Sequence, residues 1–308
     1  MRVFMTGATG VIGSRALPLL IQAGHDVTAA SRSPQNREAL RRQNVTPVEV
    51  DLFDVASVRR AIARHDAVIN LATHMPASAA KMMLPWAWRE NDHIRRDGSA
   101  AIAMAARQEN VGRMIQESFA PIYVDSGDEW IDEFTPVAPV RYNRSILDAE
   151  QSASRFTTDG GTGIVLRFGA LYGPDALLAE MLDVMRKGWS PLPGDPNAYI
   201  SSLAQDDAAT AVVAALGVPA GTYNIADDEP MRRGEWVRSL AMAAGIRPPR
   251  PLPRWVTTVG GSIMQLLSRS LRISNRRFRA ASGWAPRYPI ASSAWHDVLG
   301  AMAHARAA

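Results

Sequence analysis

The sequence contains no cysteine. This absence excludes a disulfide scaffold, a structural Cys–Zn site and a thiol nucleophile. The six histidines form no H-x-x-x-H or H-E-x-x-H pair, so a histidine metal site is not expected either. We therefore predict no metal site of any kind.

Long apolar runs are also missing. The charge-free stretch at 208–226 is interrupted by glycine and proline, and the one at 255–268 is only 14 residues long. Neither stretch is suited to crossing a bilayer. A glycine motif begins as early as Gly7, which leaves no room for an N-terminal signal peptide. We expect a cytoplasmic protein with no transmembrane segment.

Acidic residues are absent from residues 236–296, whereas ten arginines lie there. This distribution predicts a cationic C-terminal part on an acidic body, which would suit an anionic substrate or an acidic membrane surface. Solvated helix faces in an arginine-rich chain explain it more simply. Residues 255–267 could also form an interfacial amphipathic helix, although two glycines weaken it. No nucleic-acid motif is present, so no nucleic-acid partner is expected.

Apolar strand-like runs alternate with helix-like stretches through the first 170 residues. The strand-like runs are 3–6, 26–30, 46–50, 67–72, 113–116 and 163–168, and the helix-like stretches are 12–23, 36–42, 56–64, 86–109 and 142–155. This alternation predicts an α/β fold with a Rossmann-type, doubly wound parallel sheet. We expect an NAD(P)-binding domain at 1–170. Residues 171–308, which proline interrupts often, are predicted to form a smaller substrate-side lobe that returns some strands to the sheet.

A glycine loop follows the first strand directly and leads into a helix. Its predicted cofactor-binding residues are Gly7, Thr9, Gly10, Val11, Ile12 and Gly13. The glycines allow a tight turn, a close approach of the backbone to a pyrophosphate and close packing of helix on sheet. The pyrophosphate would then meet free N–H groups at the helix N-terminus. The loop predicts a dinucleotide cofactor.

The second strand ends without a carboxylate and is followed by Arg32. A carboxylate there would bind the ribose 2′-hydroxyl of NAD, whereas a guanidinium suits the 2′-phosphate of NADP. NADP(H) is therefore the predicted cofactor, with NAD(H) as the alternative. Asp51 and Leu52 are expected near the adenine. Leu71, Ala72 and Thr73 follow the fourth strand at the crevice where the cofactor would lie.

These features, with the motifs farther along the chain, resemble one family. The segments that carry the resemblance are GATGVIG at 7–13, NLA at 70–72, Leu166-Arg167, Tyr172-Gly173-Pro174, Tyr223-Asn224-Ile225 and Gly283-Trp284-Ala285-Pro286. They are similar to the short-chain dehydrogenase/reductase superfamily, in its extended or atypical epimerase/dehydratase-like branch. The resemblance implies a catalytic Tyr-x-x-x-Lys pair with a nearby Ser or Thr, and a cofactor contact at Phe168.

The catalytic positions depart from that pattern. Tyr142 matches the family tyrosine and is also expected to lie against the cofactor, but Ile146 stands where the lysine belongs. The position of the serine holds Phe119, and Ser118, one residue earlier, is the candidate to replace it. An unassisted tyrosine has a pKa of about 10 and is a poor base at neutral pH. Ala170 also replaces the asparagine that nucleotide-sugar epimerases use to hold a phosphate.

Two functions remain open. The first is an NADPH-dependent oxidoreductase acting on a small carbonyl, quinone or related acceptor, because hydride transfer is the cofactor's own chemistry. The second is a non-catalytic NADP(H)-binding sensor, as in regulatory members of the superfamily that lose the Tyr–Lys pair. Nucleotide-sugar epimerisation is a lesser alternative. The expected partner is a small-molecule substrate that could be anionic, and a homodimer is compatible with the sequence.

Overall fold

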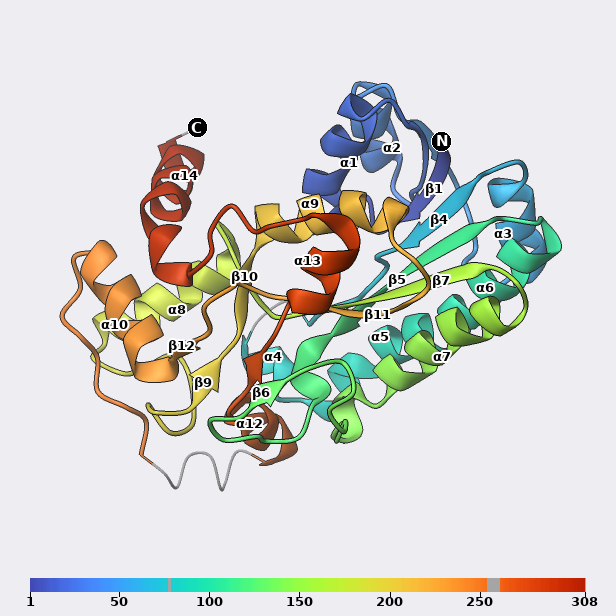
Figure 1. Cartoon of the computed structure of the whole chain (residues 1–308). Coiled ribbons are helices and arrows are strands. Elements are labelled where there is room, and N and C mark those ends of the chain that lie inside the picture. Colours follow the sequence, from blue (N-terminus) through green and yellow to red (C-terminus); the bar gives the residue numbers. More distant parts are fainter. Residues whose placement is uncertain (77–78, 254–260, 308) are drawn as a thin grey trace.

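The computed structural model describes residues 1–76, 79–253 and 261–307. Its centre is a seven-stranded parallel sheet with the strand order β11-β7-β5-β4-β1-β2-β3 (Figure 1). These strands are β1 (Arg2–Thr6), β2 (Asp26–Ala30), β3 (Thr46–Val48), β4 (Ala67–Asn70), β5 (Arg113–Phe119), β7 (Thr162–Phe168) and β11 (Gly221–Ile225). The predicted Rossmann-type sheet is confirmed.

The strand order reverses between β1 and β4. From β1 the chain moves outward through β2 to β3, then crosses back to β4 and continues through β5 and β7. The carboxyl ends of β1 and β4 therefore point to the crevice at which sheets of this type bind ligands. All residues of β4 are buried, as expected for a strand covered by helices on both faces.

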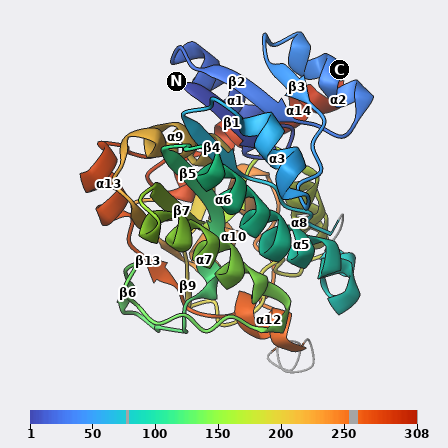
Figure 2. The same ribbon diagram turned by 90° about the vertical axis from the view of Figure 1, so that its right-hand side faces the viewer.

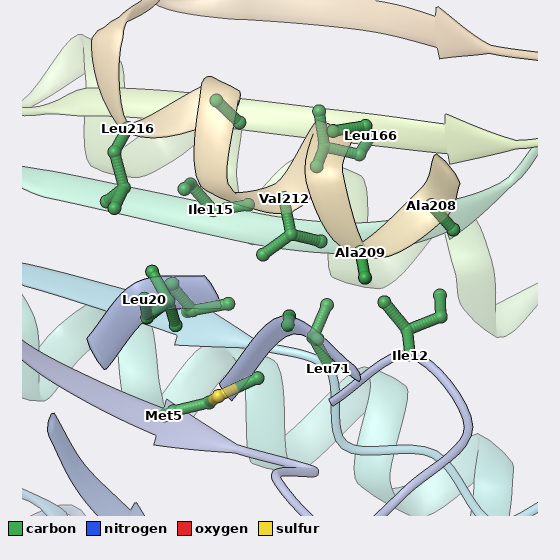
Figure 3. Packing of buried hydrophobic residues seen from close by; sticks show 14 of the residues in the cluster. Met5, Ile12, Leu20, Leu71, Ile115, Leu166, Ala208, Ala209, Val212 and Leu216 are labelled. Carbon is green, nitrogen blue, oxygen red and sulfur yellow. The ribbon is translucent and has the colours of Figure 1, made fainter. Parts of the chain in front are cut away.

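One face of the sheet is covered by α1 (Gly13–Gln22), α2 (Pro34–Arg41) and α9 (Gln205–Ala214). Figure 3 shows Leu20 and Ile12 of the α1 region on the side that faces Val212 and Ala209 of α9, in one cluster with the strand residues Met5 and Ile115. The apolar positions of α1 recur one turn apart, which gives the helix a single buried stripe. This contact fixes the beginning of α1 against the sheet, next to the glycine loop.

The opposite face is covered by α3 (Val55–Ile62), α6 (Ser99–Gln108) and α7 (Ser145–Thr158), which lie side by side in Figure 2. The helix predicted at 86–109 is present, but its hydrogen-bond pattern changes along its length. It consists of η1 (Pro85–Trp88), α5 (Arg89–His93), the π-helical turn η2 (Ile94–Gly98) and α6, with the short α4 (Ala79–Met82) before it. Single π-helical turns often mark functional positions.

After residue 170 the chain forms α8 (Ala176–Arg186), α10 (Arg233–Ala243), α12 (Gly261–Leu267), α13 (Arg276–Ser282) and α14 (Trp295–Ala307). Helices α8, α10 and α14 share a second hydrophobic cluster beside the sheet, whereas Phe278 of α13 packs in the cluster of the main sheet. Two-stranded sheets join β8 (Ala170–Tyr172) with β10 (Ser202–Ala204), β9 (Tyr199–Ile200) with β12 (Met231–Arg232), and β6 (Trp130–Ile131) with β13 (Arg272–Ile273). β11 lies at the edge of the main sheet. Short η3 (Ala120–Ile122), η4 (Arg141–Asn143), η5 (Ala215–Gly217) and η6 (Ala291–Ser293) connect these elements.

In the described ranges, no helix is long and apolar enough to span a membrane. The interfacial helix predicted at 255–267 falls partly outside the described residues. Within its second half, α12 buries Ile263 and Leu266, which is the inward packing of a helix that belongs to the fold.

Candidate functional site

The glycine loop forms a close-packed cradle at the carboxyl end of β1. Gly7 has a φ of 69°, in the left-handed region that favours glycine. A Cβ on Gly7 would overlap the carbonyl oxygen of Leu71, and one on Gly13 would overlap the carbonyl oxygen of Gly7. The amide of Gly10 closes the turn by donating to Gly7 O at 3.0 Å. We call Gly7, Gly10, Gly13 and Leu71 the glycine cradle.

At the start of α1, the amides of Val11, Ile12 and Gly13 donate to no backbone carbonyl within the described residues, whereas those of Ser14 and Arg15 donate to Gly10 O and Ile12 O. The N-cap residue, Ile12, supplies no side-chain acceptor, and the first turn holds no carboxylate. Such a helix N-terminus carries unsatisfied donors and a partial positive charge, which together favour an anion. Val11 and Thr9 are exposed beside it, whereas Ile12 is buried. The cradle and the helix end therefore fit the pyrophosphate of a dinucleotide.

Arg32 lies in the loop between β2 and α2, with 78% of its side chain exposed. Its nearest carboxylate is that of Glu90, at 3.7 Å, so its guanidinium is only weakly paired. Hydrogen bonds from Arg37 hold this loop in place, because its Nη1 donates to the carbonyl oxygens of Ser31 and Arg32 at 3.3 and 3.2 Å. Asn36 Nδ2 lies 3.5 Å from Thr9 Oγ1, which joins this loop to the glycine loop.

Asp51 and Leu52 lie where the chain leaves β3. One oxygen of the Asp51 carboxylate accepts the amide of Phe53 at 2.9 Å, so the carboxylate already orders its own turn. The Phe53 ring stacks on His93 with centroids 3.8 Å apart. Leu52 packs near Gly98 of η2. The exposed Asp51 is left with one oxygen to offer a ligand.

A buried hydrogen-bond network joins the strand ends that border the crevice. Thr6 Oγ1 donates to Asn70 Oδ1 at 2.6 Å, and Asn70 Nδ2 donates to Gln116 Oε1 at 2.8 Å and to Ser99 Oγ at 3.1 Å. It fixes the ends of β1, β4 and β5 relative to one another. Leu71 is buried above it, and Thr73 is exposed. Sequence reasoning missed Gln116 and Ser99, which no motif marks.

Phe168 does not offer its side chain to a ligand. It lies at the end of β7, opposite Phe119 of β5, and its ring is buried in the core cluster that α1 and α9 cover. A cofactor contact at this position would therefore use the backbone. Ala72, in contrast, is half-buried, and its amide lies 3.4 Å from Asn70 Oδ1 at the edge of the crevice.

Ser118 is engaged in a structural network. It is 1% exposed, and its hydroxyl donates to Glu150 Oε1 at 2.6 Å. Glu150 in turn accepts two hydrogen bonds from Arg167, at 2.8 and 2.7 Å, and Arg167 Nη1 donates to Tyr123 Oη at 2.8 Å. The structure does not bring Ser118 into hydrogen-bond contact with Tyr142. A hydroxyl bound to a buried carboxylate in this way is poorly placed to donate to a substrate.

Tyr142 lies in η4, immediately before α7. Its ring packs against that of Trp88, with centroids 4.8 Å apart. Burial raises the pKa of Tyr142 to about 12, and the positive charges of Arg95 and Arg269 act in the opposite direction. In the described part of the chain, its hydroxyl makes no hydrogen bond. Ile146, one helical turn later, is 0% exposed, so a buried apolar side chain occupies the position of the family lysine.

Asp206 and Asp207 lie in the first turn of α9 and contact segments far away in the sequence. Asp206 pairs with Arg15 of α1 at 3.0 Å. Asp207 accepts the backbone amides of Arg287 and Tyr288 at 2.7 and 3.1 Å. Both carboxylates therefore hold distant segments together, because α9 packs between the sheet and the chain before α14. The described residues contain no cluster of three metal-ligating side chains.

Comparison with known proteins agrees with this geometry. A family model described as the NAD dependent epimerase/dehydratase family matches residues 3–226. The 3-diazoavenalumate denitrifying reductase of a Streptomyces species is 32% identical over 97% of this chain and 99% of its own length. The 2-alkyl-3-oxoalkanoate reductase of Stenotrophomonas maltophilia is 27% identical over 80% of this chain and 76% of its own length.

Two solved structures show the same fold over the whole chain. A human epimerase family protein, solved with NADPH, superposes with a TM-score of 0.79 at 21% identity, covering 97% of this chain and 99% of that one. The UDP-glucose 4-epimerase of Thermus thermophilus, solved with NAD, gives a TM-score of 0.76 at 24% identity, covering 99% and 100%. The family resemblance drawn from the motifs is confirmed.

Proposed function

Because this chain belongs to the NAD-dependent epimerase/dehydratase family, we propose that it is an NADPH-dependent reductase. Its acceptor would be an electron-poor molecule that needs little help from a proton donor. The glycine cradle and the uncapped start of α1 would bind the pyrophosphate, and Arg32 would bind the 2′-phosphate. When bound, the dinucleotide supplies a hydride to the acceptor.

The observation that carries this proposal is the state of Tyr142. A phenol with a pKa of about 12 is protonated at neutral pH, so it donates a proton and does not accept one. Oxidation of an alcohol requires a base to remove the hydroxyl proton, whereas reduction of an acceptor requires at most a donor. The buried Ile146 supplies no charge that would change this balance. The site therefore favours reduction and disfavours sugar epimerisation, which begins with an oxidation.

The acceptor class follows from the weak proton chemistry. Hydride addition to an aryl diazonium ion gives the arene and N₂ and consumes no proton. A quinone consumes one proton after hydride addition, to form the hydroquinone. The Streptomyces relative, which aligns with nearly the whole chain, is named as a reductase of a diazo compound. Aryl diazonium ions and quinones are therefore the acceptors that this site suits best.

The test compares three acceptors at equal concentration: a carboxylate-bearing aryl diazonium salt, a para-quinone and a simple aliphatic ketone. NADPH consumption by the purified protein is followed by absorbance, with the spontaneous rate subtracted. We expect turnover with the first two and at most slow turnover with the ketone. NADH in place of NADPH is expected to give a lower rate at subsaturating cofactor.

Gly13→Val is the matched inactive protein, because its side chain would fill the cradle. Rates that are the same with wild type and with Gly13→Val would contradict the proposal, since they would arise outside the dinucleotide site. Faster turnover of the ketone than of the quinone would contradict the acceptor class.

A non-catalytic NADPH sensor is the second candidate. It is favoured by Ser118, which is bound to Glu150, and by Ile146 in the lysine position. Calorimetric titration with NADPH and NADH, combined with the turnover assay, distinguishes the reductase from the sensor. Tight NADPH binding without turnover of any of the three acceptors would support the sensor, whereas turnover would exclude it.

A further inference from the structure

The loop after β2 and the chain after β4 lie on opposite sides of the glycine loop. In the sheet, β1 lies between β4 and β2, and the three strands are parallel, so they end on the same side. A dinucleotide held by the glycine cradle would therefore lie between these two flanking segments. A contact that joins the two segments spans the end of β1, where the cofactor is expected.

The carboxylate of Glu90, in α5, makes such a contact. Its Oε1 lies 3.7 Å from Arg32 Nη1, in the loop after β2, and its Oε2 lies 3.6 Å from His74 Nε2, in the chain after β4. The amide of His74 donates to Asn91 Oδ1 at 2.9 Å, which ties the chain after β4 to α5. Glu90 therefore links both flanking segments through one carboxylate.

Arg32 is the cation of its loop that remains available for a phosphate. Arg37 also reaches this loop, but its Nη1 pairs with Glu49 at 2.9 Å and donates to two backbone carbonyl oxygens. Among the residues that the structure describes, Glu90 is the one carboxylate within ion-pair distance of Arg32. This pair is exposed and longer than a hydrogen bond, so an incoming phosphate can displace the carboxylate.

We propose that Glu90 is a specificity-determining residue that limits the preference for NADPH over NADH. This inference rests on the proposed function, in which Arg32 binds the 2′-phosphate. To bind, NADPH must break the Arg32–Glu90 pair and bring its phosphate close to a carboxylate, which is a like charge. NADH carries an uncharged 2′-hydroxyl, so it meets no such repulsion. Glu90 therefore weakens the binding of NADPH selectively.

The contact also explains how this loop acquires a negative charge without an acidic residue at the end of β2. In the family pattern, a carboxylate at that strand end selects NAD. Here the strand is followed by Arg32, and the carboxylate of Glu90 reaches the same loop from α5. Arginine and glutamate thus act on one position of the cofactor with opposite preferences.

Calorimetric titration of the wild type and of Glu90→Gln with NADPH and with NADH, at low ionic strength, tests the proposal. Glutamine keeps the size of the side chain and removes its charge. We expect the Kd for NADPH to fall by roughly three- to tenfold, because Arg32 is freed and the repulsion is lost. The Kd for NADH should stay within about twofold of the wild type. Equal gains for both cofactors, or no gain for NADPH, would overturn the inference.

Glu38→Gln is the matched control. It removes the same charge from an exposed glutamate of α2, which pairs with Arg41 and Arg42 on its own helix. We expect the Kd values for both cofactors to equal those of the wild type. A gain in NADPH affinity as large as that of Glu90→Gln would show that net charge alone is responsible, and it would contradict a specific role for Glu90.

A double-mutant cycle tests whether Glu90 acts through Arg32. In the Arg32→Ala background there is no guanidinium to compete for, and only the direct repulsion remains. We therefore expect Glu90→Gln to change the Kd for NADPH by at most about twofold in that background. A gain as large as in the wild-type background would exclude competition for Arg32.

Two ligands without nicotinamide make the result independent of turnover. Adenosine 2′,5′-bisphosphate carries the 2′-phosphate and adenosine 5′-monophosphate lacks it, so Glu90→Gln should strengthen the binding of the first and leave that of the second unchanged. Wild-type protein that binds NADPH but reduces no acceptor would refute the reductase function alone. An unchanged ratio of the two affinities in Glu90→Gln would refute the role of Glu90 alone. Wild-type protein that binds neither cofactor would refute both.

Discussion

The two sides of the candidate site are built in different ways. The glycine cradle comes from one short segment plus the backbone of Leu71, and each of its requirements is visible in the sequence. The proton side brings Tyr142 against Trp88 from a distant segment of the chain and buries Ile146 where the family has its lysine. Backbone geometry thus keeps the cofactor side recognisable even where the catalytic side has lost its motif.

A substitution that fills the glycine cradle is expected to have the largest effect, on the affinity for NADPH. A Cβ at Gly13 would overlap the carbonyl oxygen of Gly7, so Gly13→Val must displace the loop. We expect a loss of NADPH affinity of roughly 100-fold or more, measured by calorimetry. Gly217→Ala is the matched control, because a Cβ there meets nothing within 4 Å, and its affinity should equal that of the wild type.

Arg32→Ala is expected to have the second-largest effect, on the preference for NADPH over NADH. Loss of a charge-assisted contact to the 2′-phosphate should weaken NADPH binding by roughly 10- to 100-fold and leave NADH binding unchanged. The same titration with both cofactors measures the ratio. An equal loss for the two cofactors would show that Arg32 acts on the loop and not on the phosphate.

On the proton side, Ser118→Ala separates a structural hydroxyl from a catalytic one. Because Ser118 donates to Glu150, we expect a loss of stability of about 1 kcal/mol in denaturant unfolding. Turnover of a quinone with NADPH should remain within about twofold of the wild type. A loss of kcat of roughly 100-fold or more, without a change in stability, would assign Ser118 a direct role in catalysis.

The smallest effect is expected from pH. Burial raises the pKa of Tyr142 to about 12, so the hydroxyl stays protonated at every lower pH and loses its proton only as pH approaches that value. The kcat for quinone reduction should therefore stay level from about pH 6 to pH 9. A decline with a midpoint near pH 7 would indicate that another group supplies the proton.

The sequence predicted the fold and the close-packed geometry of the glycine loop, for a physical reason. Parallel strands covered on both faces are almost wholly apolar, and the turn at Gly7 tolerates only glycine, so both leave local patterns. The contacts of Ser118 and Glu90 could not be read in the same way. They depend on which side chains meet between β5 and α7, and between α5 and the loop after β2. Such contacts between distant segments produce no regular spacing of residue types in the sequence. The π-helical turn at Ile94–Gly98 likewise leaves no pattern in the sequence.

Transfer of deuterium from NADPH carrying deuterium at the transferable position to an aryl diazonium acceptor tests the central claim most directly. The account predicts an arene that carries deuterium, formed by the wild-type protein above the spontaneous rate, while Gly13→Val gives only that spontaneous rate. An arene without deuterium, or equal labelling with both proteins, would contradict hydride transfer at the dinucleotide site.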